Sequence, residues 1–146
     1  MREILFRGKR IDNGEWIEGY LVVREYPKTH YIVVSTLGTD KSAINNMIAT
    51  AYEVDPETVG QYTGLPDKNG KKIFEGDICR FREWSKGEMC WVGKVHWEHQ
   101  QFIIAGGPNK ECETMFELRM SRFIPEDIEI IGNIHDNPEL LEANHE

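Results

Sequence analysis

The chain has no apolar run of the roughly 20 residues that a helix needs to cross a bilayer. It also lacks the apolar core of a signal peptide near its start, where charges stand at Arg2, Glu3 and Arg7. With neither a membrane segment nor an export signal, we expect the protein to work in the cytoplasm, without a membrane partner.

Cysteine is scarce, and the three residues Cys79, Cys90 and Cys112 are odd in number and widely spaced. They describe neither a disulfide framework nor a paired zinc motif, and they fit a reducing compartment. His96 and His99 resemble metal ligands at first. However, strand residues an odd number apart point to opposite faces unless the chain turns there.

His96 and Glu98 would share a strand face and could combine with Cys79 or Cys90 from a neighbouring strand. Such a mixed site lacks the ligand spacing of known zinc motifs, and partly exposed polar residues are the simpler interpretation. We therefore expect no metal, and no feature of the chain points to another cofactor.

Catalytic motifs are missing as well. Gly64 and Gly106-Gly107 lack the Walker spacing and the Lys-Ser/Thr pair that follows it. His135 and Asp136 could act as a base and its orienting acid, but no positioned nucleophile accompanies them. The alternative is that Asp136 or Asn137 caps a terminal helix while His135 is partly exposed. We expect that the protein is not an enzyme.

Lysine and arginine are absent from residues 125–146, which carry seven acidic residues. The rest of the chain has 18 acids against 17 bases, so most of the net charge of -8 comes from this one end. A pI near 5.2 argues against nucleic-acid binding. Because residues 1–124 are nearly neutral, a local basic face is compatible with the low pI of the whole chain.

Turn signals, by contrast, are dense between residues 54 and 81. Asp55-Pro56 suits the start of a helix or turn, and Asn69-Gly70 tolerates the positive φ angles of a tight hairpin. Glu75-Gly76-Asp77 predicts a further turn before a strand over residues 78–84. A turn of this kind before an aromatic strand is typical of small SH3-like barrels.

Short β-compatible runs predict strands through most of the remaining chain. They are expected at residues 4–9, 15–23, 31–35, 48–54, 90–97, 101–105, 113–120 and 127–131. Asn13-Gly14 predicts a hairpin between the first two, and residues 15–23 have no clearly polar face. The segment 36–46 is either a loop or a short helix. Asn137-Pro138 can begin a short helix through Glu142.

Several groups of residues resemble the YopX family of phage and prophage proteins. They are Arg7-Gly8-Lys9, Trp16-Ile17-Glu18-Gly19-Tyr20, the core from Val54 to Ile78, and the run from Glu129 to Leu141. The resemblance spans nearly the whole chain, although residues 25–51 and 82–120 match no family pattern. It implies a mainly β, phage-derived protein of the host cytoplasm with an SH3-like C-terminal part. It implies no activity, cofactor or catalytic residue.

The length of 146 residues, of which 40% are hydrophobic, allows one substantial core or two small fused ones. We expect a mainly β fold with a minor α component, forming one compact unit. Residues 1–54 would form an N-terminal β lobe and residues 55–76 a turn-rich connector. Residues 77–146 would form an SH3-like small barrel with an acidic C-terminal helix.

Arg80, Arg82, Trp84 and Lys94 are candidate nucleic-acid contacts. The two arginines are expected on one face of a strand, and Lys94 on its partner strand between two tryptophans. On small barrels, cations can follow phosphates and aromatic rings can stack on bases. The alternative is that the tryptophans fill the core while the arginines remain solvated.

Ile134, Leu140 and Leu141 are candidate interface residues. With exposed strand edges, they could complete the sheet or core of a second copy, or they could close the protein's own barrel. We expect a non-enzymatic phage accessory protein that binds itself or a host or phage protein. Nucleic-acid binding by the small barrel is the alternative function.

Overall fold

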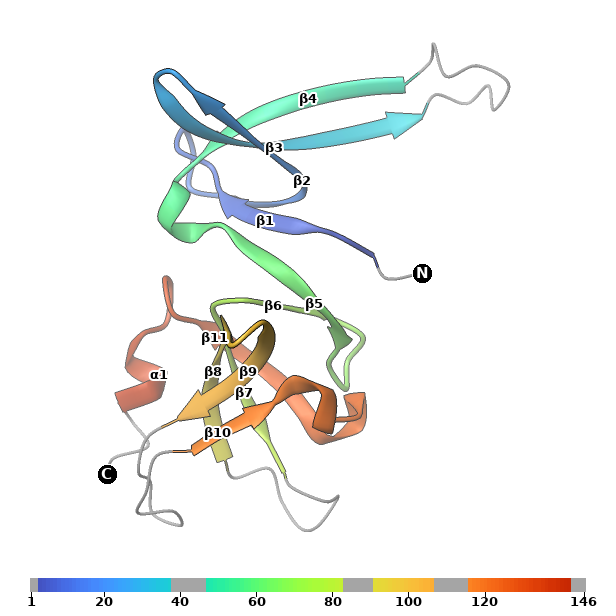
Figure 1. Cartoon of the computed structure of the whole chain (residues 1–146), viewed down its shortest axis with the longest axis vertical. Coiled ribbons are helices and arrows are strands. Elements are labelled where there is room, and N and C mark those ends of the chain that lie inside the picture. The colour runs from blue at the N-terminus through green and yellow to red at the C-terminus, as the bar shows by residue number, and fades with distance from the viewer. Residues whose placement is uncertain (1–2, 38–46, 83–90, 107–115, 143–146) are drawn as a thin grey trace. The chain divides into compact units, whose positions relative to one another are not determined.

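The computed structural model describes residues 3–37, 47–82, 91–106 and 116–142 of the chain (Figure 1). Within these ranges nearly all regular structure is antiparallel strand, with a single short α-helix near the C-terminal end. The predicted mainly β fold is therefore confirmed. The chain divides into two compact units, Met1–Gln61 and Tyr62–Glu146, and the division falls inside the predicted connector.

The N-terminal unit is built on one antiparallel sheet. Its strands are β1 (Phe6–Lys9), β2 (Trp16–Glu25), β3 (Lys28–Leu37), β4 (Met47–Val54) and the first residues of β5 (Gly60–Pro66). They lie in the order β4-β3-β2-β1-β5, so β4 is an edge strand. The predicted hairpin at Asn13-Gly14 joins β1 to β2, and Gly14 has the positive φ of 73° that such a turn favours.

One face of this sheet forms the core of the N-terminal unit. Ile32 and Val54 are fully buried there, and two glycines allow the strands to approach them closely. A Cβ atom on Gly19 would lie 2.3 Å from the carbonyl oxygen of Val33. A Cβ atom on Gly8 would lie 2.9 Å from the side chain of Val54. A larger residue at either glycine would therefore push the sheet apart.

The C-terminal unit begins within β5, which pairs with β6 (Lys72–Phe74). A five-stranded antiparallel sheet follows in the order β10-β9-β8-β7-β11. Its strands are β7 (Asp77–Phe81), β8 (Trp91–Glu98), β9 (Gln101–Gly106), β10 (Phe116–Arg119) and β11 (Ile128–Asn133). The helix α1 (Glu139–Glu142) comes last, as predicted. The SH3-like character of this unit stays a prediction.

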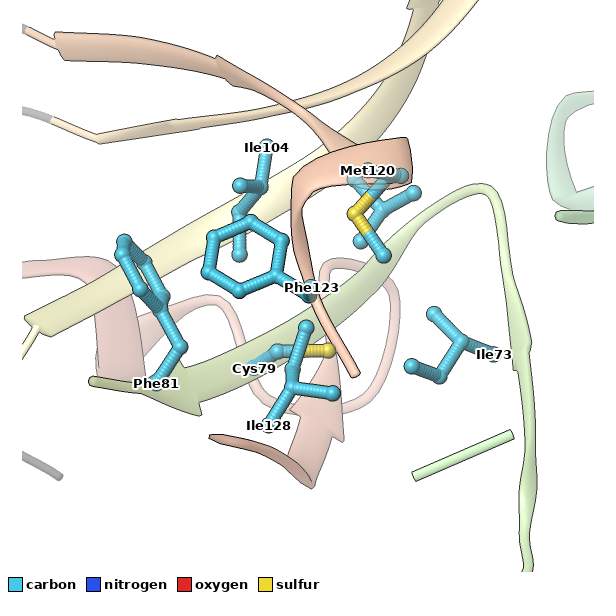
Figure 2. Close-up of a cluster of buried hydrophobic side chains, with 8 residues drawn as sticks. Ile73, Cys79, Phe81, Ile104, Met120, Phe123 and Ile128 are labelled. Carbon is cyan, nitrogen blue, oxygen red and sulfur yellow. The ribbon is translucent and has the colours of Figure 1, made fainter. Parts of the chain in front are cut away.

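Figure 2 shows the hydrophobic core of the C-terminal unit. Its buried members are Ile73, Cys79, Phe81, Val95, Ile104, Met120, Phe123 and Ile128. The rings of Phe81 and Phe123 meet edge to face, with centroids 5.1 Å apart. Strand alternation turns Cys79 and Phe81 into this core and places Ile78 and Arg80 on the opposite face. Cys79 is a buried free thiol within this packing.

The turns follow the chemistry predicted from the sequence. Asp55 caps a short 3-10 helix, and its Oδ1 accepts the backbone N–H of Glu57 at 3.0 Å. Gly70 has a φ of 79° between β5 and β6, and Gly76 has a φ of 88° just before β7. The predicted turns at Asp55, Gly70 and Gly76 are confirmed, although Asn69 does not take a positive φ. The predicted strand over 78–84 begins at Asp77 and ends at Phe81, while residues 83 and 84 lie outside the described residues.

Asp67, which sequence analysis did not single out, joins the β5–β6 hairpin to β11. It is only 2% exposed. Its carboxylate accepts three backbone N–H groups, those of Asn69, Lys71 and Ile130, at 2.9, 2.9 and 3.0 Å. The next residue, Lys68, donates its own N–H to the carbonyl oxygen of Ile128 at 2.9 Å. The outer edge of β11 is therefore covered by this hairpin loop.

Candidate functional site

Two of the four predicted nucleic-acid contacts lie together on the C-terminal sheet. Strands β7 and β8 pair so that Ile78 lies opposite Lys94 and Arg80 lies opposite Val92. Arg80 and Lys94 therefore share a face, and both are exposed. Trp84 lies outside the described residues.

Acidic residues accompany the two arginines. Arg80 lies directly opposite Glu129 of β11. Arg82 lies beyond the end of β7, and its Nε donates to Oδ1 of Asp127 at 2.9 Å. Because Asp127 is 7% exposed, this ion pair belongs to the packed part of the unit. Arg82 is thus paired within its own unit. Of the predicted nucleic-acid contacts that the structure describes, Arg80 and Lys94 are the ones on an exposed strand face.

The histidines of the β8–β9 hairpin both reach Glu98. His99 and Gln100 form the turn, with φ angles of 53° and 63°. His96 lies on the same strand face as Glu98, and its Nε2 is 3.0 Å from Oε2 of Glu98. His99 comes round the turn to 3.5 Å from Oε1. The hydrogen bond with His96 lowers the pKa of the Glu98 carboxyl below its ordinary value.

This cluster does not amount to a metal site. In the described ranges, no group of three or more His, Cys, Asp or Glu side chains has an arrangement that could hold a metal ion. Cys79 points into the core, on the face of the sheet opposite to His96. Cys90 lies outside the described residues.

The candidate interface residues of the C-terminal segment pack against their own unit. Ile134, Leu140 and Leu141 are all half-buried. Helix α1 contacts β8, and Leu140 Cδ1 lies 2.7 Å from the position that a Cβ atom on Gly132 would occupy. The N–H of Ile134 donates to the carbonyl oxygen of Gly76 at 2.8 Å. These contacts support the alternative in which the segment closes its own unit.

Asparagine side chains hold the turn before α1. This is the turn in which His135 and Asp136 were considered as a base and its orienting acid. The side-chain oxygen of Asn133 accepts the N–H groups of His135 and Asp136 at 3.0 and 2.9 Å. Asn137 Oδ1 accepts the N–H of Asn133 at 3.3 Å. Asp136 is exposed, and its Oδ2 accepts the side-chain amide of Asn133 at 3.2 Å. These hydrogen bonds stabilise the turn.

A second candidate surface lies on the N-terminal sheet and was not assigned from the sequence. The face opposite the core carries apolar residues from three adjacent strands, and we call it the outer sheet face: Tyr20, Val22, Tyr31, Val33 and Ala51. Tyr20 is 59% exposed and Val22 is 49% exposed. The signal was present in the sequence, since the second predicted strand had no clearly polar side.

Charged and polar residues surround this apolar centre. On β1, Arg7 and Lys9 lie on the same face, with the Arg7 guanidinium 4.8 Å and the Lys9 ammonium 5.9 Å from the centre of the Trp16 ring. Arg24 and Glu53 border the face on the other strands. An apolar centre with a polar rim is the usual anatomy of a protein-binding surface.

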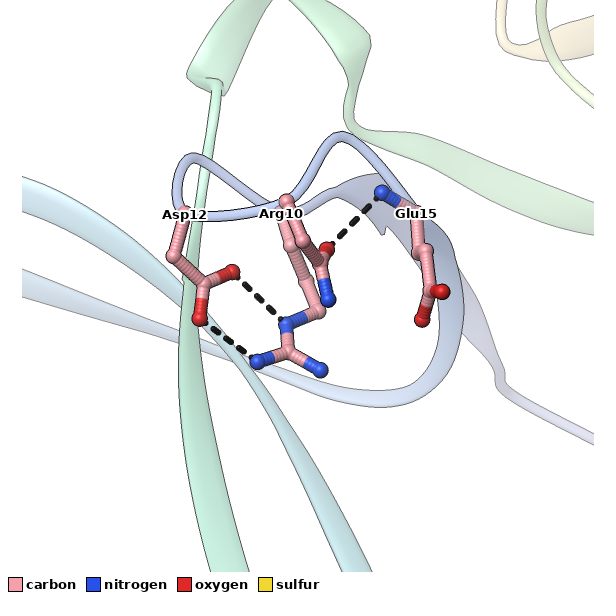
Figure 3. A network of polar contacts seen from close by, with 4 residues as sticks. Arg10, Asp12 and Glu15 are labelled. Atoms are coloured by element: carbon pink, nitrogen blue, oxygen red, sulfur yellow. Dashed lines mark hydrogen bonds and ion pairs between the residues drawn. The ribbon is translucent and has the colours of Figure 1, made fainter.

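Figure 3 shows the network of polar contacts in the β1–β2 turn around Arg10. Arg10 forms a bidentate ion pair with Asp12, with distances of 2.9 and 2.6 Å. The same guanidinium lies 4.3 Å from the centre of the Tyr52 ring of β4. The hydrogen bond with Arg10 lowers the pKa of Asp12 and raises the pKa of Arg10. The turn is thereby fixed against the C-terminal end of β4.

Within the part of the chain that the structure describes, no helix combines the length and the apolar character needed to cross a membrane.

Comparison with known proteins gives a fold neighbour and a family. The chain is similar to the crystal structure of protein EF1440 from Enterococcus faecalis, with a TM-score of 0.52 and 21% sequence identity. The similarity covers 97% of this chain and 99% of that chain, and at this identity it concerns the fold alone. No curated protein matches the chain. The model of the YopX protein family matches residues 5–142. Since that match spans nearly the whole sequence, the chain belongs to the YopX family.

Proposed function

We propose that this protein is a non-enzymatic, phage-derived accessory module that works by binding protein, with a second copy of itself as the first partner. The observation that carries the proposal is the outer sheet face, where Tyr20 and Val22 expose about half or more of their surface at the centre of an ordered sheet. Contiguous apolar patches of this kind mark interaction sites on soluble proteins.

The energetics favour association through this face. Fully burying a side chain of the size of valine or phenylalanine is worth about 1.5–3 kcal/mol. Tyr20 also has a hydroxyl group that can reach water at the rim while its ring is covered. The rim charges of Arg7, Lys9 and Arg24 would then select among partners more than they would add affinity.

The phage origin and the location in the host cytoplasm are parts of the same proposal. Membership of the YopX family supports the former. The buried free thiol of Cys79 fits the latter, because a reducing compartment leaves it unmodified.

Nucleic-acid binding is the second candidate function, supported by the shared exposed face of Arg80 and Lys94. It ranks lower because Glu129 lies opposite Arg80 and Asp127 holds Arg82. Residues 62–146 also carry 16 acids against 10 bases, which opposes contact with phosphate.

Sedimentation velocity over a range of protein concentrations tests the proposal. We expect a faster-sedimenting species that grows with concentration and is weakened at least tenfold by the double substitution Tyr20→Ser, Val22→Ser. Ile11→Ser is the matched control, since Ile11 is equally exposed at 59% but lies in the β1–β2 turn. This control should associate like the wild type.

A second measurement covers partners other than a second copy. Wild-type and Tyr20→Ser, Val22→Ser proteins are immobilised, and the proteins retained from phage-infected host cells are compared. A chain that stays monomeric at every concentration, and two columns that retain the same proteins, would together overturn the proposal.

A further inference from the structure

The five-stranded sheet of the C-terminal unit is packed on both of its faces. One face carries the core shown in Figure 2. Strand alternation turns Ile78, Val92 and Ile103 to the opposite face, which we call the second sheet face. All three side chains are nevertheless buried. The second sheet face is therefore an apolar surface that other parts of the chain cover.

Residues 133–142, which we call the terminal strap, lie on this face. Gly132 is opposite Ile78 in the pairing of β11 with β7, and residues directly opposite share a face. Leu140 Cδ1 and Asn137 Oδ1 each lie 2.7 Å from the position that a Cβ atom on Gly132 would occupy. Helix α1 also contacts β8, the strand next to β7. The missing side chain of Gly132 thus leaves a notch that receives Leu140.

The terminal strap is a short structure that is joined to the sheet at its beginning. There, the N–H of Ile134 donates to the carbonyl oxygen of Gly76 at 2.8 Å. The N–H groups of Asn137, Leu140 and Leu141 donate to carbonyl oxygens within the strap. Helix α1 spans four residues, whereas an isolated helix in water needs about 12–15. The order of the strap therefore depends on its docked side chains, and such segments open more easily than core strands.

Charges of opposite sign meet on the second sheet face. It exposes three cationic residues, Arg80, Lys94 and Arg119, whereas the acidic Glu98 and Glu129 on it are half-buried. Residues 133–142 carry three acidic residues and no lysine or arginine. Complementary charge of this kind selects among partners. The face therefore suits an acidic segment that also brings apolar side chains.

We propose that the second sheet face is a binding site for an acidic protein segment with two adjacent leucines, and that the terminal strap occupies this site until a partner's segment displaces it. The strap shows the chemistry of the ligand, with Leu140 in the notch at Gly132 and carboxylates around it. The site belongs to the C-terminal unit. It is a function beyond self-association through the outer sheet face.

The occupant is a segment of a different protein. The strap is tethered, so its effective concentration at the site is in the millimolar range, whereas the same segment of a second molecule loses translational and rotational freedom on binding. An identical strap therefore cannot displace the resident one. A partner has to combine the same leucines and carboxylates with further contacts to the exposed Arg80, Lys94 and Arg119.

Binding of a peptide to the full chain tests this site. The probe is a fluorescently labelled peptide of residues 133–142, and fluorescence anisotropy reports its affinity. In the wild type the resident strap competes, so binding should be weak. The variant Leu140→Ser, Leu141→Ser releases the strap, and it should bind the peptide at least tenfold more tightly. A peptide that carries the same two serines should bind neither protein.

Further substitutions in the released variant test the two parts of the site. Arg80→Glu with Lys94→Glu should lower the affinity for the peptide at least tenfold and remove its salt dependence. Lys28→Glu with Lys71→Glu makes the same change in net charge at exposed lysines elsewhere, and it should leave the affinity unchanged. Gly132→Ala fills the notch and should also weaken binding.

The outcomes decide between the site and its alternatives. A released variant that keeps its circular dichroism spectrum but does not bind the peptide would overturn the proposal. Equal affinity of the wild type and the released variant would overturn the role of the strap as the occupant. Tyr20→Ser, Val22→Ser should bind the peptide like the wild type, so failure of this site leaves self-association standing.

Hydrogen exchange in the wild type provides a second test that needs no variant to fold. The amide of Ile134 should exchange at least tenfold faster than the slowest amides of β7 and β8, because the strap opens without the sheet. Equal exchange rates would show that the strap opens only when the whole unit unfolds. That result would overturn displacement by a partner.

Discussion

The carboxylate of Asp67 accepts the backbone N–H of Ile130 at 3.0 Å, across 63 residues of sequence. The same carboxylate closes its own hairpin loop through Asn69 and Lys71. One buried side chain therefore shapes a turn and attaches it to the last strand of the sheet. This arrangement also covers the edge of β11.

Replacement of Asp67 by alanine should destabilise the C-terminal unit by at least about 3 kcal/mol. Three part-buried N–H groups lose their carboxylate acceptor, and a hydrogen bond to a charged group contributes about 1.5–3 kcal/mol. Urea unfolding measures the loss, and hydrogen exchange at the Ile130 amide should accelerate. Glu126→Gln, at an exposed position, is the control. Equal unfolding midpoints for Asp67→Ala and the control would contradict the role of Asp67.

Asp127→Ala should destabilise the protein by about 2 kcal/mol, because it leaves the partly buried Arg82 guanidinium without its carboxylate. Lys94→Ala, on an exposed position of β8, should change stability by less than about 0.5 kcal/mol. Thermal unfolding of both variants provides the comparison. A similar Tm for the two would show that the Arg82–Asp127 pair contributes little to the fold.

Arg10→Gln should raise the pKa of Asp12 toward its ordinary value of 3.8, because the hydrogen bond from Arg10 is the main cause of its lowered pKa. A lowered folded-state pKa means that the ion pair stabilises the turn above pH 3.8. That contribution is lost as the pH falls through the lowered pKa. Carboxyl-carbon NMR titration of Asp12 provides the measurement.

Arg24→Gln is the control for this titration, since Arg24 lies on β2 away from the β1–β2 turn. The Asp12 titration should be the same in this variant as in the wild type. An Asp12 pKa that does not move in Arg10→Gln would refute the assignment of its cause.

In gel-shift experiments we expect no retardation of single-stranded or duplex nucleic acid, even at low salt. The acidic C-terminal unit and the carboxylates near Arg80 and Arg82 oppose phosphate contacts. The opposite result would support nucleic-acid binding. It would be a gel shift that weakens steeply with salt and is lost in the double variant Arg80→Ala, Lys94→Ala. Lys28→Ala, in the N-terminal unit, is the control, and this variant would have to bind nucleic acid like the wild type.

Short-range features of the fold could be predicted from the residues themselves. Gly14 and Gly70 adopt the positive φ angles that their turns need, and Asp55 bonds to an amide two residues away. These interactions depend on neighbours in sequence. The positions of the hairpins and the mainly β character therefore follow from local chemistry.

The candidate sites were less predictable, because they depend on which strands lie side by side. Arg82 reaches Asp127 across 45 residues only because β11 pairs with β7. Sequence alternation placed Arg80 and Lys94 on neighbouring strands, but it could not show that Glu129 would lie opposite Arg80.

The amino-acid order alone established a β protein with turns at known places, since side-chain periodicity and turn preference act over a few residues. It also predicted a strand over residues 15–23 with no clearly polar face. Long-range pairing decided which side is buried, and Gly19 lies on that side, where a Cβ atom would meet the backbone of β3. The same pairing left β4 at the edge of the sheet, a property that belongs to the order of strands and to no single segment.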